Sequence, residues 1–349
     1  MSVVYKKLED VCEILDSRRV PITAKDRKAG TYPYYGANGL QDYVADYIFD
    51  DELVLLAEDG GNFGSKERPI AYRVSGKCWV NNHAHVLKAK TNIHVDYLCY
   101  ALMFYDTEGL VNGATRQKLT QAAMRQMVIP YRDMTEQLQI IKKISQIVRS
   151  IEKRKEELQL LDQLVKSRFI ELFAGVEAED TLQNLCTFID YRGKTPEKVE
   201  SGLPFITAKN IRMHHMSFDT LEYISKETYD RVMTRGFPQI GDVVFTTEAP
   251  LGNVCRIPFI ETEFYIGQRI ITMQTERLEP AYLEYALSSD EFKRKIAEKS
   301  SGSTVTGIRS KLLEQLTIPV PPRAQQQQFA AFVEQTDKSK LCGKMEVAA

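Results

Sequence analysis

Two stretches of the chain repeat each other. Residues 113–146 align without a gap with residues 302–335, and eight of the 34 aligned pairs are identical. Unrelated sequences of average composition would share about two. Each stretch contains Gly-x-Thr, then Ile-Pro, then six residues and a Gln: Gly113, Thr115, Ile129, Pro130 and Gln137 in the first copy, and Gly302, Thr304, Ile318, Pro319 and Gln326 in the second. A repeat this long indicates a duplicated domain and not a stacked solenoid array.

The parts of the chain before these stretches also match, but in a different register. Leu8, Cys12 and Asp16 align with Leu182, Cys186 and Asp190. Further along, residues 58–62 resemble 248–253 if one residue is inserted. Strand-like runs (52–57, 85–89, 242–247 and 270–274) and helical patterns (95–105 and 280–299) occur in both copies. We therefore expect an α+β fold with two similar mixed α/β domains, 1–132 and 181–322, separated by long coiled-coil helices.

The segment 133–180 between the two domains has the pattern of one long helix. It contains no Gly or Pro from residue 135 to 173, and its apolar residues recur at alternating spacings of three and four. These are Ile140, Ile144, Ile147, Ile151, Leu158, Leu161, Val165 and Leu172. Such spacing predicts a coiled-coil seam that contacts a partner helix, although a long core helix is the alternative. A helix over 136–173 would be about 57 Å long.

The second copy of this helix, in residues 323–349, is predicted to be truncated. Phe329 and Val333 continue the seam, but the apolar pattern fades after them. A helix over 324–341 would be about 27 Å long, roughly half the first. Part of the first helix would then lack its partner, which predicts that another chain, or a second copy of this one, covers it.

Composition narrows the class of protein. Lys and Arg number 46 against 47 Asp and Glu, a formal net charge of −1, which argues against a strongly basic DNA coat protein. The six cysteines are scattered without a Cys-x-x-Cys pair, as in a reduced protein. No run approaches the ~20 apolar residues of a membrane span, and the N-terminus does not resemble a signal peptide. We expect a soluble, cytoplasmic protein.

The sequence lacks the signatures of two common classes of enzyme. It has no phosphate-binding Gly-x-x-x-x-Gly-Lys-[Ser/Thr] and no Asn-Pro-Pro-Tyr of adenine methyltransferases. The glycine-rich run 60–64 fits a tight turn better than a phosphate cradle. His83 and His85 could share one face of a strand and hold a metal, but no Cys or acidic cluster lies nearby in sequence. We therefore predict no metal, no bound cofactor and no catalytic site.

The whole layout resembles the specificity subunit of type I restriction–modification systems. The residues that carry the resemblance are Gly113–Thr115, Ile129–Pro130 and Gln137 with the helix behind them, and their second copies. The resemblance implies that 1–132 and 181–322 are target-recognition domains, each reading half of a split sequence in double-stranded DNA. It also implies an antiparallel helix pair that spaces the halves, docked adenine methyltransferase subunits that carry S-adenosylmethionine, and restriction subunits. A coiled-coil scaffold with duplicated protein-binding domains is the alternative, and an enzyme with a cryptic site is a third.

Base readout requires side chains that donate or accept two hydrogen bonds, and phosphate contacts require hydroxyls or cations. In the first domain the candidates for base contact are Asn38, Asn62, Lys66, Asn81, Asn82 and His83. In the second they are Lys209, Asn210, Asn253, Gln268 and Arg269. Thr115, Arg116 and Thr304 are candidates for phosphate contact. Because neither domain carries a strong basic excess, we expect the chain alone to bind DNA weakly.

Overall fold

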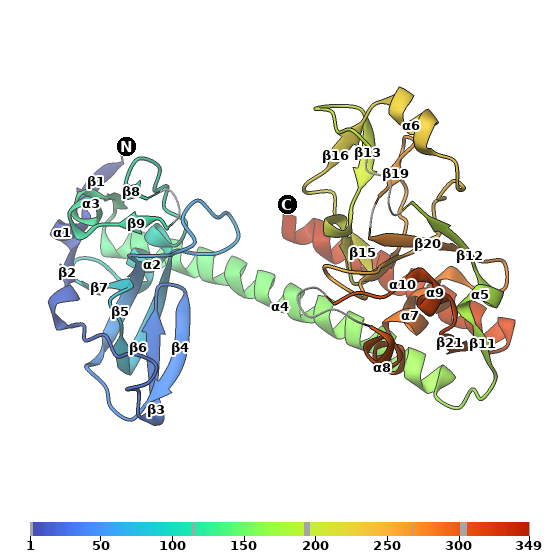
Figure 1. Cartoon of the computed structure of the whole chain (residues 1–349). Helices are drawn as coiled ribbons and strands as arrows, with labels where there is room; N and C mark the ends of the chain where they lie inside the picture. Colours follow the sequence, from blue (N-terminus) through green and yellow to red (C-terminus); the bar gives the residue numbers. More distant parts are fainter. Residues whose placement is uncertain (1–2, 114–115, 192–195, 268, 301–305, 349) are drawn as a thin grey trace. The chain divides into compact units, whose positions relative to one another are not determined.

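The computed structural model describes the chain apart from residues 1–2, 114–115, 192–195, 268, 301–305 and 349, and it describes side chains up to residue 341. The chain forms two compact units, Met1–Glu152 and Lys153–Ala349. The boundary between them falls inside helix α4 (Met134–Phe173), drawn in green in Figure 1. In the described residues, no helix is long and apolar enough to cross a membrane. The five cysteines whose side chains are described form no disulfide.

Unit 1 is built on a six-stranded sheet with the strand order β2-β7-β5-β6-β3-β4. Its strands are β2 (Cys12–Ile14), β3 (Ala29–Gly36), β4 (Gly39–Val44), β5 (Phe49–Ala57), β6 (Ala71–Val80) and β7 (Ala84–Ala89). The smaller elements are β1 (Val4–Lys7), α1 (Leu8–Val11), α2 (Val95–Met103), β8 (Val111–Asn112), β9 (Lys118–Leu119), α3 (Gln121–Gln126) and β10 (Val128–Tyr131). Residues 53–57 of β5 are fully buried, because side chains pack on both faces of this central strand.

Unit 2 contains a four-stranded sheet of order β12-β20-β17-β18 and a three-stranded sheet of order β16-β13-β19. These strands are β12 (Thr187–Asp190), β13 (Leu203–Ile206), β16 (Glu222–Ile224), β17 (Val243–Thr246), β18 (Val254–Arg256), β19 (Tyr265–Ile266) and β20 (Ile270–Gln274). Short pairs are β11 (Glu179–Thr181) with β21 (Thr317–Pro319) and β14 (Ile211–Arg212) with β15 (His215–Met216). The helices are α5 (Leu182–Leu185), α6 (Lys226–Val232), α7 (Pro280–Ser288), α8 (Asp290–Lys299), α9 (Ser310–Glu314) and α10 (Arg323–Ala348).

The two units share one connectivity, so the predicted duplication and mixed α/β domains are confirmed. In each unit a central strand lies between two antiparallel neighbours, β6 and β7 beside β5 and β18 and β20 beside β17. In each unit, the strand that follows the first short helix pairs with one of these neighbours: β2 pairs with β7 in unit 1, and β12 pairs with β20 in unit 2. The outlying pairs β1-β10 and β11-β21 also correspond. The three-stranded sheet of unit 2 corresponds to β6-β3-β4 of unit 1, since β13 pairs parallel with β19 and antiparallel with β16, as β3 does with β6 and β4.

The repeated Gln of the sequence motif has the same buried place in both units. Gln137 is fully buried, and its Oε1 accepts a hydrogen bond from the His94 N–H at the N-terminus of α2 (2.8 Å). Gln326 is 1% exposed, and its Oε1 accepts one from the Glu279 N–H at the N-terminus of α7 (2.9 Å). A helix N-terminus leaves N–H groups unpaired, so an amide oxygen brought from another helix stabilises it. The repeated Gln therefore has a structural role: it connects each long helix to the N-terminus of a domain helix.

The long helix begins and ends close to its predicted bounds, whereas the second helix extends further than the sequence predicts. Helix α10 has 26 residues and continues through 342–348, whereas the sequence predicted an end at 341. Loss of the apolar pattern does not end a helix whose residues have adequate intrinsic propensity. At ~1.5 Å per residue, α10 is about 39 Å long. It remains shorter than α4, which has 40 residues.

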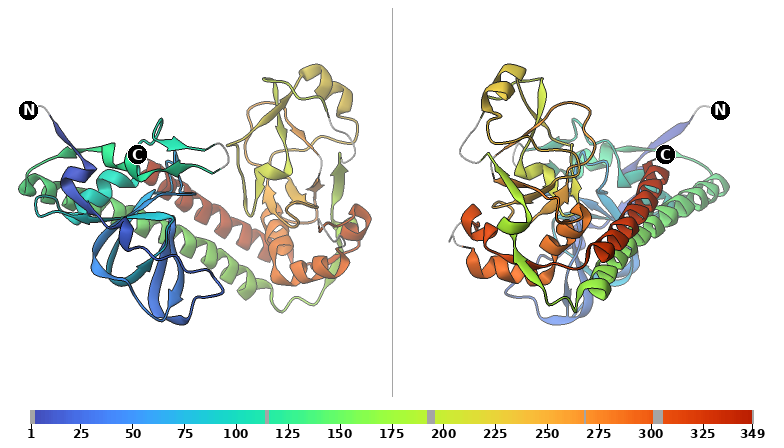
Figure 2. Two further views of the ribbon diagram at one scale, coloured as in Figure 1. Left: turned by 60° about the vertical axis from the view of Figure 1, so that its left-hand side comes forward. Right: turned by 90° about the vertical axis from the view of Figure 1, so that its right-hand side faces the viewer.

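Within unit 2, α10 packs antiparallel to the second half of α4 (Figure 2). Phe329 packs against Phe173 with ring centroids 5.6 Å apart, and further along α10 the Lys340 Nζ pairs with the Asp162 carboxylate at 2.7 Å. Val165, Phe329 and Val333 are fully buried there, and Leu158, Leu161 and Leu172 are half-buried.

The first half of α4 belongs to unit 1 and has a different environment. Ile140 packs partly buried against the core, and Ile144 and Ile151 are half-buried. Ile147 is 59% exposed. Its predicted seam contact is absent from the described part of unit 1, where Ile140 and Ile141 pack on the domain core and Ile147 faces outward.

Candidate nucleic-acid interface

The loop that follows β5, the central strand of unit 1, is hydrogen-bonded to two other segments. The N–H of Glu58 donates to the His83 carbonyl at 2.8 Å, and the N–H of Leu119 donates to the Glu58 carbonyl at 2.8 Å. Asp59 then forms an isolated bridge with Lys118. These bonds bring the segments before β7 and after β8 to the end of β5.

Unit 2 has the same three main-chain interactions at the end of β17. The N–H of Thr247 donates to the Arg269 carbonyl at 2.8 Å, and the N–H of Ile308 donates to the Thr247 carbonyl at 3.0 Å. Glu248 forms an isolated bridge with Gly307. In this register Glu248 corresponds to Asp59, and Arg269 corresponds to His83.

In unit 1 the Asp59 carboxylate binds two nitrogen-bearing side chains. Its Oδ1 lies 2.6 Å from the Arg116 Nε, and its Oδ2 lies 3.4 Å from the His83 Nδ1. The guanidinium lies against Gly60, whose φ of +68° favours glycine and where an added Cβ would come within 3.2 Å of the Arg116 Nε. Asn38 donates to the Gly60 carbonyl at 3.0 Å. Arg116 stays 59% exposed, so it is held in place and still reaches solvent.

In unit 2 the corresponding carboxylate holds Arg269. The Glu248 Oε1 lies 2.9 Å from the Arg269 Nε, and the side chain of Arg269 is 53% exposed. The backbone of Arg269 has φ +68°, a conformation that costs a non-glycine residue roughly 1–2 kcal/mol. Strain of this kind persists where the surrounding structure imposes it and is concentrated at functional sites.

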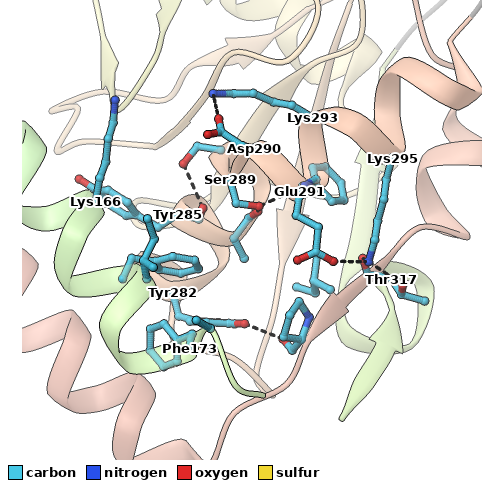
Figure 3. Close-up of a pocket in the computed structure, with 18 residues that line it drawn as sticks. Lys166, Phe173, Tyr282, Tyr285, Ser289, Asp290, Glu291, Lys293, Lys295 and Thr317 are labelled. Atoms are coloured by element: carbon cyan, nitrogen blue, oxygen red, sulfur yellow. Dashed lines mark hydrogen bonds and ion pairs between the residues drawn. The ribbon is translucent and has the colours of Figure 1, made fainter. Parts of the chain in front are cut away.

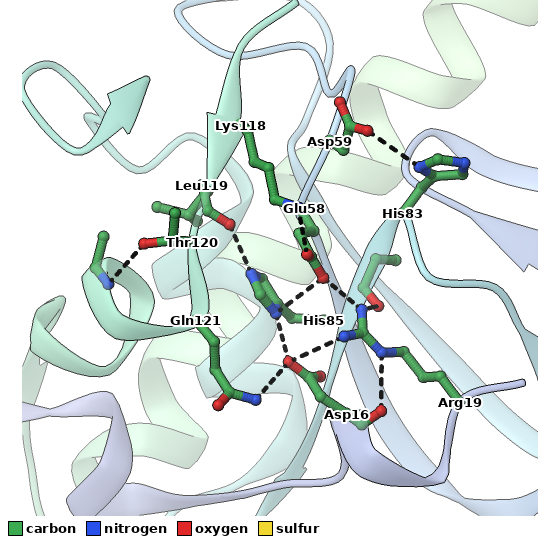
Figure 4. Close-up of polar contacts among 12 residues, drawn as sticks. Asp16, Arg19, Glu58, Asp59, His83, His85, Lys118, Leu119, Thr120 and Gln121 are labelled. Carbon is green, nitrogen blue, oxygen red and sulfur yellow. Dashed lines mark hydrogen bonds and ion pairs between the residues drawn. The ribbon is translucent and has the colours of Figure 1, made fainter. Parts of the chain in front are cut away.

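In unit 1, an ion-pair network lies beneath the loop that carries Asp59 (Figure 4). The Glu58 carboxylate binds Arg19 at 2.6 Å and Lys118 at 3.2 Å. The buried His85 donates from Nδ1 to the Asp16 carboxylate at 2.6 Å, and its Nε2 lies 2.9 Å from the Leu119 carbonyl. Since a carboxylate and a carbonyl only accept, both bonds require a doubly protonated ring. The network anchors the loop at 58 to the first residues after β2.

The same network explains the two histidines. His85 is buried with Asp16 and Glu58, whereas His83 is half-buried and faces Asp59, so the two do not share a site. The ligand atoms of Asp16, Glu58 and His85 lie within 4.8 Å of one another, an acidic surrounding that the sequence did not reveal. The Arg19 guanidinium and the Lys118 ammonium already neutralise these carboxylates. The arrangement is an ion-paired structural cluster, and we assign no metal to it.

Three of the predicted contact residues have structural roles that correct their assignment. Asn81 is 3% exposed and donates to the Gln41 Oε1 at 3.0 Å. Asn210 is 1% exposed and caps a short 3₁₀ turn (Ala208–Asn210). Asn253 is half-buried and donates to the Ile211 carbonyl at 2.8 Å. Their amides are engaged in hydrogen bonds within the fold, so we leave them out of the proposed contacts.

The other predicted residues are accessible to different degrees. Asn38, Lys66, Asn82, Arg116, Lys209 and Arg269 are exposed, and Asn62 and His83 are half-buried. Thr115, Gln268 and Thr304 lie outside the described residues. The structure brings Asn38, His83 and Arg116 together around one loop.

Asp59 and Glu248 are not among the residues predicted from the sequence, because that prediction rests on side chains that can contact DNA directly and not on groups that position them. The sequence comparison placed Glu58, not Asp59, opposite Glu248. The ungapped alignment of the two Gly-x-Thr stretches, extended towards the N-terminus, places Asp59 opposite Glu248, so the signal was present.

A pocket of about 410 Å³ lies elsewhere in unit 2, between the end of α4 and helices α7 and α8 (Figure 3). Its apolar side includes Phe169, Phe173 and Tyr282, and its rim carries the ion pair of Lys295 with Glu291 at 3.2 Å. A second, open groove of about 980 Å³ runs along α4 and α10. It contains the exposed side chains of Leu160 and Leu164. None of the predicted DNA contacts lines either cavity.

Comparison with known families gives two matches in this chain. The model described as "Type I restriction modification DNA specificity domain" matches residues 2–161 and again residues 181–343. The two matches together span nearly the whole chain and coincide with the two copies of the duplication.

The relatives of the chain include two proteins named as specificity subunits. A Haemophilus influenzae protein named as a type I restriction enzyme specificity subunit is 37% identical over 140 residues, 40% of this chain and 36% of that protein. The chain thus aligns with about a third of that relative. The MjaVIII specificity subunit of Methanocaldococcus jannaschii is 21% identical over 95% of this chain and 85% of its own.

The structural likenesses concern the fold. The type I restriction–modification S subunit of M. genitalium has a TM-score of 0.58 and 14% identity, covering 100% of this chain and 92% of its own. A chain from a structure on the assembly and conformational transition of a type I system has a TM-score of 0.51 and 17% identity, with coverage of 100% and 94%.

Proposed function

The chain belongs to the family of type I restriction modification DNA specificity domains, and we propose that it reads a bipartite sequence in double-stranded DNA as a subunit of a type I restriction–modification complex. The observation that carries the proposal is the duplicated loop site. Each unit presents an exposed arginine beside a carboxylate at the end of its central strand. Two equivalent reading sites suit a target with two halves.

We propose that the remaining predicted residues, which are exposed or half-buried where the structure describes them, make the DNA contacts. In unit 1 these are Asn38, Asn62, Lys66, Asn82, His83 and Arg116, and in unit 2 they are Lys209 and Arg269, with Thr115, Gln268 and Thr304 retained from the sequence. Amide and guanidinium groups can distinguish adenine and guanine in the major groove. The near-zero net charge supports weak binding by the chain alone and a larger phosphate contact by its partners.

The chain itself, in this proposal, is not catalytic and holds no cofactor. An adenine methyltransferase subunit would bring S-adenosylmethionine, and restriction subunits would join the complex. The reduced cysteines of the described residues suit the cytoplasm, where the DNA target would be.

We place the methyltransferase on the exposed apolar side of α4 in unit 2. Leu160 is 55% and Leu164 49% exposed, and both line the groove along α4 and α10. Neighbouring apolar side chains left in water commonly mark a protein interface. Polar groups of Arg154, Gln163 and Lys338 rim the groove, as at the edge of many interfaces. A second copy of the chain is the competing occupant, and light scattering of the purified chain distinguishes it.

Selection from a random duplex DNA pool tests the function. The chain would be purified with and without the adenine methyltransferase subunit of its own system, and the retained DNA would be sequenced. We expect a two-part motif with a fixed gap, retained more strongly with the methyltransferase and lost at high salt. Retention without any enriched sequence, or a motif in one block, would contradict the proposal.

A further inference from the structure

We infer that Asp59 and Glu248 are positioning residues that aim Arg116 and Arg269 at a base edge, one in each half of the DNA target. The inference rests on the proposed function and adds roles for four residues. It also changes the proposed role of Arg116, for which the sequence alone predicts a phosphate contact.

The first argument is that the two carboxylates hold the same atom of their arginines. Asp59 binds the Nε of Arg116 at 2.6 Å, and Glu248 binds the Nε of Arg269 at 2.9 Å. Nε is the guanidinium nitrogen nearest the main chain, so the two terminal nitrogens project beyond the ion pair. That terminal pair is one of the edges by which a guanidinium can bind two acceptors such as O6 and N7 of guanine.

The second argument is that the two carboxylates stand at corresponding positions while their arginines come from different segments. Asp59 and Glu248 both bridge to the segment that follows the Gly-x-Thr motif. Arg116 belongs to that segment, whereas Arg269 comes from the turn before β20. The acid–arginine pair is therefore common to both sites although its arginine has two origins. A pairing produced by local sequence alone would not repeat in this way.

The third argument concerns charge. Each arginine is partly neutralised by its carboxylate, and each site therefore offers little net attraction to a phosphate. A negatively charged phosphate placed beside Arg116 or Arg269 would also meet the carboxylate. The edge of a base carries no net charge, so a carboxylate next to it is tolerated. The arrangement favours base readout over phosphate binding.

The backbone around each arginine limits its movement. Gly60 supplies the surface on which the Arg116 guanidinium lies. Arg269 is held at φ +68° while its carbonyl accepts from Thr247 and its side chain pairs with Glu248. A side chain fixed in this way loses little freedom when it binds, which is the condition for sequence discrimination.

The experiment is the random-pool selection with the chain and its methyltransferase subunit, applied to Asp59→Asn, Glu248→Gln, Arg116→Lys and Arg269→Lys. Lysine keeps the charge and removes the planar fork. We expect the unit 1 variants to reduce the preference for one base in one half of the motif by about 10-fold or more. The unit 2 variants should do so in the other half, and each should leave the opposite half unchanged.

Asp51→Asn and Glu263→Gln are the matched controls. Asp51 pairs with Lys88 at 2.7 Å and Glu263 pairs with Lys226 at 2.6 Å, both away from the loops at 58 and 247. Neither control should alter the motif. Melting temperatures and retention of the unaffected half-site verify folding of all variants.

The outcomes separate the inference from the proposed function. A wild-type chain that enriches no two-part motif contradicts both. A two-part motif that all four variants leave unchanged contradicts only the inference. Uniformly weaker binding with unaltered base preferences would show that the arginines contact phosphates, which also overturns it.

Discussion

Gln137 of α4 accepts a hydrogen bond from the main-chain N–H of His94, the residue that caps α2, at 2.8 Å. Its Nε2 donates to the carbonyls of Asn92 at 3.1 Å and Arg132 at 2.9 Å. One side chain thus joins the start of the long helix to the domain. Gln326 makes the corresponding bonds at the start of α10, to Glu279 and Pro321.

Gln137→Ala should lower the free energy of unfolding by about 1–3 kcal/mol, because it leaves buried main-chain groups unpaired. Gln139→Ala, an exposed glutamine of the same helix that is also repeated, is the control and should change stability by less than about 0.5 kcal/mol. Urea unfolding of the full chain measures both. Equal effects of the two variants would refute the structural role.

Gly60→Ala should cost roughly 1 kcal/mol of backbone strain and displace the Arg116 guanidinium. Gly64→Ala is matched to it, since Gly64 has φ +75° but open space where a Cβ would stand. Both variants should lower the melting temperature similarly, and only Gly60→Ala should weaken sequence-specific DNA binding. If the two bind DNA equally well, the contact with Arg116 is irrelevant to recognition.

Asp16→Asn should be strongly destabilising in a pH-dependent way. Burial acts to raise the pKa of the Asp16 carboxyl, but bonds and charge from His85, with bonds from Val86 and Gln121, lower this pKa below 3.8. A lowered folded-state pKa gives stability that is complete above the unfolded-state pKa and disappears as the pH falls through the folded-state value.

We therefore expect Asp16→Asn to lower the free energy of unfolding by about 3 kcal/mol at neutral pH. This difference from wild type should shrink when the pH falls below about 4. Denaturant unfolding of wild type and Asp16→Asn across this range measures the difference. Exposed Asp46, replaced in the same way, is the control. A difference that stays constant with pH would show that packing, and not ionisation, is responsible.

The double variant Leu160→Asp with Leu164→Asp should abolish copurification of the methyltransferase subunit without unfolding the chain. Charged groups in the groove cannot be buried without a large desolvation cost. Leu138→Asp changes another exposed leucine of α4 outside the groove and should leave copurification intact. Retained methyltransferase with loss of a dimer in light scattering would assign the groove to a second copy instead.

Much of the architecture can be predicted from the chain alone. The duplication follows from the repeated motifs, and the mixed α/β domains and the extent of α4 follow from periodicity among neighbouring residues. The length of α10 was predicted less well, because the seam pattern and the helix propensity end at different residues.

The site was predicted in part. His83 and Arg269 were both proposed as contacts, but their equivalence depends on hydrogen bonds to Glu58 and Thr247, across strands. The ungapped alignment that places Asp59 opposite Glu248 places His83 opposite Thr272, so no single ungapped alignment relates both pairs. Burial likewise removed Asn81 and Asn210, since an amide that caps a turn and one that reads a base look the same in sequence.

The sequence by itself determined that two similar domains and a long helix form, because apolar spacing and repeated motifs act over a few residues. Only the tertiary structure decided which side chains face solvent and which carboxylate holds which arginine. Those relations arise where strands distant in sequence pair in a particular register, and the register is a property of the whole sheet.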